Sequence, residues 1–393
     1  MFGKILTRFS RLAWQWQVTL IYGVARLVSV LIMLATASFQ PDNPWTGPHP
    51  SYFQYTQFWD SQWYQTIYDT GYPNKLPKDE IGIVEQSPWA FYPLFPAIVK
   101  LLNKVTTVDW LYLAPLTATL LGFLAALVIY KLFRTVANHT QTLWAIALIA
   151  FLPVAPILQV PYAESLQLFL LAICLYYLRK QNYPQLFLVI PLLCLSRPIG
   201  APWAALLAFY TFYRWFIAKD FKSKSELYQN IALVVYSGIW ALVWAFLAGY
   251  VTGIPDAYTK TEMSWRGSGD LVLFEPWFKI GVYMLGPIGV IAPVIIFGLF
   301  FWALYSKPCR ELGIELQLWC AAYGLYLFAV FEPQTSTFRM LIPLFPMLLA
   351  LVMKINSKII LIAILCISIP LQILWVGELW NFVPLPQGGD WPP

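Results

Sequence analysis

Long apolar runs separated by short polar segments make up most of the chain, and eleven of them resemble membrane-embedded helices. A spanning helix needs about 20 predominantly apolar residues. The pattern therefore predicts an all-α polytopic membrane protein with about 11 transmembrane helices, folded as a single integral membrane domain over residues 1–393. The expected helices are 16–38, 110–133, 142–159, 163–178, 185–196, 201–218, 230–252, 277–305, 314–331, 335–353 and 359–380.

Two of these runs are short and interrupted by prolines. Segments 185–196 and 201–218 are interrupted by Pro191, Pro198 and Pro202. Proline removes a backbone donor and kinks a helix, so these segments are expected to be either complete spans or broken, re-entrant helices.

Two polar segments, 39–109 and 254–276, are much longer than the turns between the other runs. In the first of them Trp59, Trp63 and Ile67 repeat at helical spacing, so its aromatic residues are expected to be either belt residues at the membrane edge or one face of an interfacial helix. The basic residues before the first run are followed by no small-residue cleavage site, so that run is expected to be a retained helix rather than a removable signal.

Lysine and arginine positions predict the orientation in the membrane. With the N-terminus in the cytoplasm, most basic residues fall on short cytoplasmic loops, and nearly all carboxylates fall on the opposite side. Segments 39–109 and 254–276 then become the first and second extracytoplasmic loops. The basic residues on the cytoplasmic side are Lys4, Arg8, Arg11, Lys131, Arg134, Arg179, Lys180, Arg214, Lys219, Lys222, Lys224, Lys307, Arg310, Lys354 and Lys358.

Composition agrees with a membrane protein. Hydrophobic residues are 59% of the chain and charged residues 11%, against about 25% charged in a typical soluble domain. The net charge of +6 comes from scattered residues rather than a basic patch, so nucleic acid is not expected as a partner. The five cysteines and two histidines show no metal-ligand spacing.

Five charged residues stand at or just beyond the predicted outer ends of the spans: Asp60, Glu164, Arg197, Arg266 and Arg339. Ionisable groups near membrane depth are costly and usually functional. Two acids and three arginines at one face therefore predict a site for an anionic ligand.

Each of the five also has a structural explanation. Asp60 and Glu164 are suitable N-caps for the helices that follow them. Arg197 and Arg339 are placed as snorkelling anchors at helix ends. Arg266 lies in a polar loop, where arginine is commonly solvated.

Several motifs resemble, in order, those of the GPI mannosyltransferase 2 family and its bacterial relatives, which are polytopic glycosyltransferases of the GT-C class. Phe58 and the Phe338-Arg339-Met340 run depart from that family's usual pattern, which concerns the sugar and the acceptor more than the class. The matching stretches are FWDSQWYQTIYDTGY, WAFYPLFPAIVKLL, PYAESLQLFLLA, LSRPIGA, DAYTKTEMSWRG and STFRMLIPLFPMLLA.

The resemblance implies a GT-C-type glycosyltransferase fold and a polyprenyl-phosphate-linked sugar donor. Asp60 matches the essential acid of the first extracytoplasmic loop in this class, and would act as general base on an acceptor hydroxyl. The expected substrate-binding residues are Glu164, Arg197, Arg266, Arg339, Trp59, Trp63 and Tyr64.

In this interpretation the arginines bind the donor phosphate, and the aromatic rings contact the sugar and exclude water. No cofactor and no metal are expected. The protein would lie in the lipid bilayer, in a bacterial plasma membrane, with a lipid, glycan or protein acceptor. Two alternatives stay open at this stage, a polytopic lipid or sugar transporter or flippase and a non-catalytic envelope assembly protein.

Overall fold

The computed structural model describes residues 9–266, 271–383 and 393. Their regular structure is helical, apart from one isolated bridge between Lys78 and Val84. Contacts divide the chain into two compact units. The first comprises Met1–Gln62, Leu102–Tyr176 and Phe338–Pro393, and the second comprises Trp63–Leu101 and Tyr177–Thr337. Each unit is described by itself, and the predicted single domain stays a prediction.

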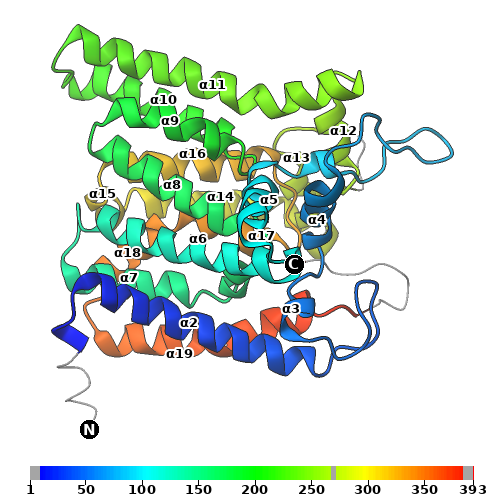
Figure 1. Ribbon diagram of the computed structural model, residues 1–393. Helices are drawn as coiled ribbons and strands as arrows, with labels where there is room; N and C mark the ends of the chain where they lie inside the picture. The colour runs from blue at the N-terminus through cyan, green and yellow to red at the C-terminus, as the bar shows by residue number, and fades with distance from the viewer. Residues whose placement is uncertain (1–8, 267–270, 384–392) are drawn as a thin grey trace. The chain divides into compact units, whose positions relative to one another are not determined.

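The helices of each unit follow the predicted apolar runs closely (Figure 1). Those of the first unit are α2 (Trp14–Ala37), α3 (Tyr52–Tyr55), α6 (Trp110–Phe133), α7 (His139–Ala150), η2 (Ala155–Gln159), η5 (Ile342–Leu344), α18 (Pro346–Lys354), α19 (Lys358–Trp375) and η6 (Val376–Trp380). Those of the second are η1 (Pro88–Ala90), α9 (Tyr183–Cys194), α10 (Gly200–Phe212), η3 (Tyr213–Ala218), α11 (Lys224–Thr252), α12 (Ala257–Met263), α13 (Glu275–Leu285), η4 (Gly286–Val290), α14 (Ile291–Leu304), α15 (Lys307–Glu311) and α16 (Ile314–Val330). Helices that cross a unit boundary are α4 (Ser61–Thr70), α5 (Leu94–Thr106), α8 (Glu164–Arg179) and α17 (Thr337–Met340).

Length and composition identify fewer complete spans than the sequence predicts. Among the described residues five helices are long and apolar enough to cross a membrane, or six if the bent pair Thr337–Leu344 and Pro346–Lys354 is one span. The predicted count of about 11 is therefore not confirmed. The other runs are helical but short: α7 and α9 have 12 residues each, which is about 18 Å of helix.

Among the described residues, breaks within predicted runs occur near Pro153 and Pro346, whereas segments 185–196 and 201–218 are helical and whether they span the membrane stays a prediction. Pro191 lies inside a continuous α9, and α10 is also uninterrupted. The 142–159 run instead divides into α7 and η2 around Pro153, and the 335–353 run bends by 71° before Pro346. Proline lacks the N–H that would continue the helix, but the surrounding packing decides which proline ends it.

In the first unit α2 and α6 pack against each other in opposite directions. At one end the ring of Trp14 stacks on Tyr130 at 4.5 Å between ring centroids, and Lys131 Nζ lies 5.9 Å from the Trp14 ring. At the other end Trp110 Nε1 donates to Gln57 Oε1 over 2.8 Å. Each helix has 24 residues, or about 36 Å. The basic end of this unit is therefore a membrane thickness away from the loop that carries Asp60.

A buried arginine of α2 donates hydrogen bonds to the backbone carbonyls on both sides of the break between α7 and η2. Arg26 Nη2 donates to the carbonyl oxygen of Ala150 over 2.7 Å, and Nη1 donates to that of Ala155 over 2.5 Å. Carbonyls freed by a helix break cannot reach water inside a bilayer, so a side chain must pair with them. Arg26 thus fixes the chain that leads into α8.

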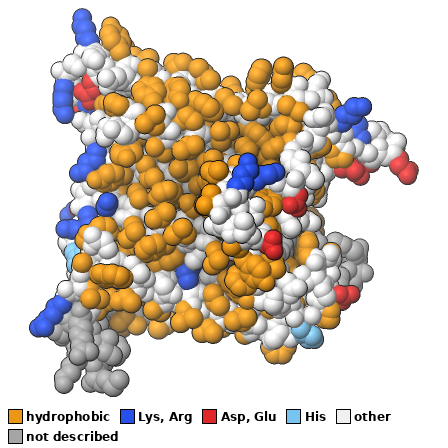
Figure 2. Space-filling view, in the orientation of Figure 1, with side chains coloured by type: hydrophobic (Ala, Val, Ile, Leu, Met, Phe, Trp, Pro, Cys, Tyr) orange, Lys and Arg blue, Asp and Glu red, His pale blue; other side chains and the backbone are white. Residues whose placement is uncertain are grey.

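Outward faces of the helices are apolar, and Figure 2 shows hydrophobic side chains over most of the visible surface. On α2 the exposed residues include Leu20, Leu27 and Leu31, and on α11 they include Ile239 and Phe246. Together with the long apolar helices, this composition is that of an integral membrane protein.

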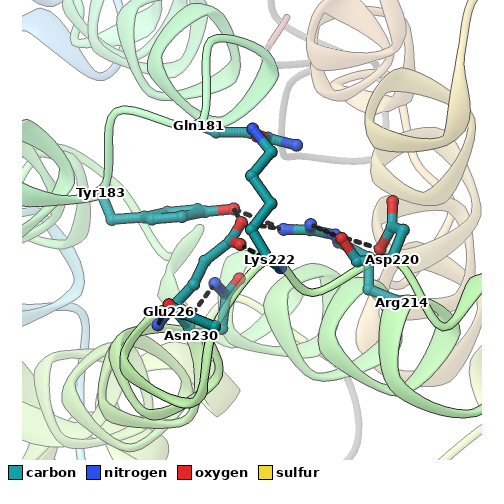
Figure 3. A network of polar contacts seen from close by, with 8 residues as sticks. Gln181, Tyr183, Arg214, Asp220, Lys222, Glu226 and Asn230 are labelled. Atoms are coloured by element: carbon teal, nitrogen blue, oxygen red, sulfur yellow. Dashed lines mark hydrogen bonds and ion pairs between the residues drawn. The ribbon is translucent and has the colours of Figure 1, made fainter.

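In the second unit α10 packs against α11 and α16. A polar network lies where α10 continues into the π-helix η3, and Figure 3 shows its residues. Arg214 Nε pairs with Asp220 Oδ1 and Arg214 Nη1 with Glu226 Oε1, each over 2.7 Å. Arg214 is buried, and Nη1 also donates to Tyr183 Oη. The sequence assigns Arg214 to a cytoplasmic turn, and in the structure it is buried and forms ion pairs with Asp220 and Glu226.

Candidate functional site

Asp60 lies between α3 and α4 in the first unit, and its carboxylate faces an arginine from a distant part of the chain. Asp60 Oδ2 is 2.7 Å from Arg339 Nη2, and Glu164 Oε1 accepts a hydrogen bond from Arg339 Nη1 over 3.1 Å. One guanidinium thus bridges two carboxylates through its two terminal nitrogens. Three residues selected from sequence as separate candidates form one cluster.

The exposed fractions of these side chains differ. The side chain of Glu164 is 2% exposed and that of Arg339 10%, whereas that of Asp60 is 17% exposed. Asp60 is therefore the more solvent-accessible of the two acids in the cluster. The Nε of Arg339 is buried and has no hydrogen-bond partner among the described residues.

Tyr162 joins the three charged residues. Its hydroxyl oxygen accepts the backbone N–H of Asp60 over 2.9 Å, and Arg339 Cζ lies 5.2 Å from the centre of its ring. Burial, followed by the charge of Asp60, raises the pKa of Tyr162, so this hydroxyl stays protonated at physiological pH. The tyrosine holds the backbone of Asp60 while the arginine holds its carboxylate.

Local sequence explains how these residues are presented. Glu164 begins α8 shortly after Pro161 and lies in the first helical turn, where the helix dipole favours a carboxylate. Arg339 lies in the short helix α17, and the chain turns sharply again before Pro346. Both side chains lie at helix ends beside breaks in apolar runs, and broken helices often carry binding sites in membrane proteins.

The second unit contains the other two predicted arginines. Arg266 Nε is 3.9 Å from Glu332 Oε2, and both Arg266 and Arg197 act electrostatically on Tyr326 of α16. Glu262 acts on the same tyrosine, and is half-buried rather than fully solvated. Arg197 and Arg266 thus share one neighbourhood.

The predicted aromatic residues contact other aromatic rings, and of the three only Trp63 is partly exposed. Trp63 stacks on Phe91 at 5.9 Å and meets Trp265 edge-on at 5.7 Å. Tyr64 is 2% exposed, and its ring contacts Phe91. In the first unit Trp59 is 5% exposed, and its indole Nε1 donates to the backbone of Trp380.

The eight predicted site residues are therefore divided between the two units. Asp60, Glu164, Arg339 and Trp59 belong to the first, and the first three are in direct contact. The others, Arg197, Arg266, Trp63 and Tyr64, belong to the second. Convergence of both groups on one ligand stays a prediction.

Sequence reasoning missed Tyr162 and Trp380. Tyr162 lies in the PYAES stretch beside Glu164, so its position next to a candidate acid was a usable signal. Trp380 had no such signal, because aromatic residues at the end of an apolar run usually mark the membrane interface. Among the described residues no three His, Cys, Asp or Glu side chains form a group that could hold a metal ion.

No protein-family model matches the chain, and no curated protein matches it either. Similar solved structures include the Archaeoglobus fulgidus oligosaccharyltransferase in its apo form, with 14% identity and a TM-score of 0.50 over 95% of this chain. Its complex with zinc and sulfate has 15% identity and a TM-score of 0.49 over 91% of this chain. The archaeal enzyme in complex with an inhibitory peptide and a dolichol-phosphate has 13% identity and a TM-score of 0.47 over 92%.

This chain spans 57% of the length of the apo oligosaccharyltransferase, 53% of the zinc and sulfate complex and 56% of the peptide complex. At 14% identity, the likeness to the apo form shows the fold. The chain has the all-α GT-C fold that the sequence motifs predict.

Proposed function

We propose that this protein is a membrane glycosyltransferase that moves a sugar from a polyprenyl phosphate to an acceptor hydroxyl on the extracytoplasmic side, with inversion at the anomeric carbon. Within that class, the motifs shared with the GPI mannosyltransferase 2 family favour mannose as the sugar. The observation that carries the proposal is the cluster of Asp60, Arg339 and Glu164, formed in a chain with a GT-C fold.

Asp60 acts as the general base. The acceptor oxygen forms a bond to the anomeric carbon while its proton passes to the Asp60 carboxylate. The bond between that carbon and the donor phosphate breaks, and the electron pair leaves with the polyprenyl phosphate. The partial exposure of Asp60 gives the acceptor access to the carboxylate.

Arg339 and Glu164 hold the base in place. The guanidinium binds the Asp60 carboxylate on one side, and Glu164 binds the guanidinium on the other. Arg197 and Arg266 supply positive charge for the departing phosphate, because arginine forms two parallel hydrogen bonds to phosphate oxygens.

The test is a transfer assay with the purified protein. The donor is polyprenyl-phosphate-[¹⁴C]mannose, and the acceptor is a membrane extract from cells that lack the gene. Label must move to a product other than the donor. Carriers of glucose, galactose and arabinose are assayed in the same way, to identify the sugar.

Asp60→Asn is the decisive variant because it preserves volume but removes the base. Turnover is expected to fall by about 10²–10⁴-fold while the donor still binds. Asp69→Asn is the matched control, since Asp69 is an exposed acid of the same loop, and it should keep wild-type turnover. A protein that moves lipid-linked sugar across vesicles without forming a covalent product is a transporter, and that result would replace the proposal.

A further inference from the structure

Trp59, the residue before Asp60, has an unusual backbone conformation. Its φ is +61°, in the left-handed region that bulky L-residues rarely adopt. Such a conformation persists only when the surroundings hold it, and it occurs often at active sites. The residues that hold Trp59 therefore also determine where Asp60 points.

Those residues come from the end of η6. Trp59 Nε1 donates to the carbonyl oxygen of Trp380 over 2.7 Å. In return, Trp380 Nε1 donates to the carbonyl oxygen of Tyr55 over 3.0 Å. Both hydrogen bonds are buried, so water does not compete for them. The two bonds join the loop before Asp60 to a segment more than 300 residues away.

Asn381 and Phe382, which follow Trp380, also form hydrogen bonds with the segment that precedes Asp60. Tyr55 Oη donates to Asn381 Oδ1 over 3.2 Å. Gln40 and Phe382 exchange two hydrogen bonds of 2.9 Å, one from Gln40 Nε2 to the Phe382 carbonyl and one from the Phe382 N–H to Gln40 Oε1. Each residue from Trp380 to Phe382 is thus bonded to the segment that leads to Asp60.

Trp380 also borders the other side of the cluster. It is fully buried, and its ring centre is 5.5 Å from that of Tyr162. Tyr162 in turn accepts the Asp60 N–H and lies against the Arg339 guanidinium. The π-type bond from the Asn381 N–H to the Val376 carbonyl, 2.9 Å, ends η6 at this point. Single π-turns of this kind are frequent at functional sites.

We propose that the segment Trp380–Phe382 positions the general base, with Trp380 as the positioning residue. Trp380 contacts both Trp59, which precedes Asp60 in the chain, and Tyr162, which accepts the Asp60 backbone N–H. Through these two residues it keeps the Asp60 carboxylate next to Arg339. This inference rests on the proposed function. A purely structural role would instead lower stability without a specific effect on the Asp60 step.

Trp380→Phe keeps a six-membered aromatic ring but removes the five-membered ring of the indole, with the N–H that is donated to the Tyr55 carbonyl. Trp203→Phe is the matched control, because the same change is made at a fully buried indole N–H of α10 that has no hydrogen-bond partner among the described residues. In the transfer assay, with the donor that gives product, kcat of Trp380→Phe is expected to fall about tenfold, since small displacements of a catalytic group are costly. Donor KM should stay within about twofold of wild type, as should both constants of the control.

A double-mutant cycle with Asp60→Asn tests whether Trp380 acts through the base. When the base is absent, Trp380→Phe should change the residual turnover by less than about twofold. A full tenfold loss in the Asp60→Asn background, a wild-type kcat for Trp380→Phe, or an equal loss in Trp203→Phe would each overturn the inference. Wild-type turnover of Asp60→Asn alone would instead overturn the proposed function.

If Trp380→Phe aggregates on size exclusion, Tyr55→Phe takes its place. This variant removes only the hydroxyl bonded to Asn381. It should lower kcat and leave donor KM unchanged, and it should lose its effect in the Asp60→Asn background. Failure of either expectation overturns the positioning role of the segment.

Discussion

Arg339 contacts two carboxylates that come from distant parts of the chain. Its position at a helix end predicts an anchor or a phosphate ligand. In the structure its two terminal nitrogens face Asp60 and Glu164 at 2.7 and 3.1 Å. The planar fork of a guanidinium allows this, because it presents donors on two sides at fixed angles.

Arg339→Lys should separate these roles. Lysine keeps the charge but loses the planar fork, so it cannot hold both carboxylates in the same geometry. We expect turnover to fall about ten- to a hundredfold, from the loss of one charge-assisted hydrogen bond. If Arg339 mainly holds Asp60, kcat falls and donor KM stays constant; if it mainly binds phosphate, donor KM rises.

The control for this change is Arg179→Lys. Arg179 and Glu315 form another arginine–glutamate pair of 2.7 Å, and neither residue belongs to the proposed site. This variant should keep both kinetic constants. Unchanged constants in Arg339→Lys would remove Arg339 from both roles and leave the phosphate to Arg197 and Arg266.

At the scale of elements, the interrupted helices determine where the site residues lie. The run predicted as one helix over 142–159 stops at Ala150 and continues as η2, which leads to Tyr162 and Glu164. Arg26 makes this interruption possible by pairing with the carbonyls of Ala150 and Ala155. A charged residue in the middle of an apolar helix is therefore part of the support of the site.

Arg26→Met should destabilise the protein. It leaves two buried carbonyl groups without their partner, at about 1–3 kcal/mol each. We expect the apparent melting temperature in detergent to fall by about 5 °C or more. Arg11→Met is the control, because Arg11 is exposed. This variant should have the melting temperature of the wild type. An unchanged melting temperature for Arg26→Met would mean that other groups satisfy the break.

At the scale of the whole molecule, the arrangement of basic residues predicts which ends of the helices face the cytoplasm. Within the first unit Lys131 and Trp14 lie together at one end of α2 and α6. Gln57 and Trp110, on the side of Asp60, lie together at the other end. This separation matches the predicted topology of that unit. The membrane side of each end stays a prediction.

Cysteine labelling tests that topology. Cys366 is the exposed cysteine among the five, and the other four are buried, so Cys366→Ala gives a suitable background. In that background Glu80→Cys should react with a membrane-impermeant maleimide in intact cells. Lys307→Cys should react only after the cells are permeabilised, although the Lys307 side chain is 82% exposed. The reverse pattern would invert the orientation and place Asp60 in the cytoplasm.

The sequence by itself determined the class of the molecule, because hydrophobic length and composition are local properties. Eleven apolar runs predicted helices, and every run contains helix in the structure. It also identified Asp60, Glu164 and Arg339, because charged residues near membrane depth are rare enough to be noticed one by one. The structure then placed these three in contact.

Only the tertiary structure decided how those residues pair and what supports them. Proline marks a possible break, yet Pro191 is accommodated inside α9 while the run containing Pro153 is interrupted. Whether a helix breaks at a proline depends on whether a neighbouring side chain such as Arg26 can donate hydrogen bonds to the freed carbonyls. Likewise, Trp380 and Trp59 are more than 300 residues apart, and their hydrogen bond leaves no periodic signal in the sequence. Composition indicates that the chain lies in a membrane, whereas long-range packing decides which side chains lie next to Asp60.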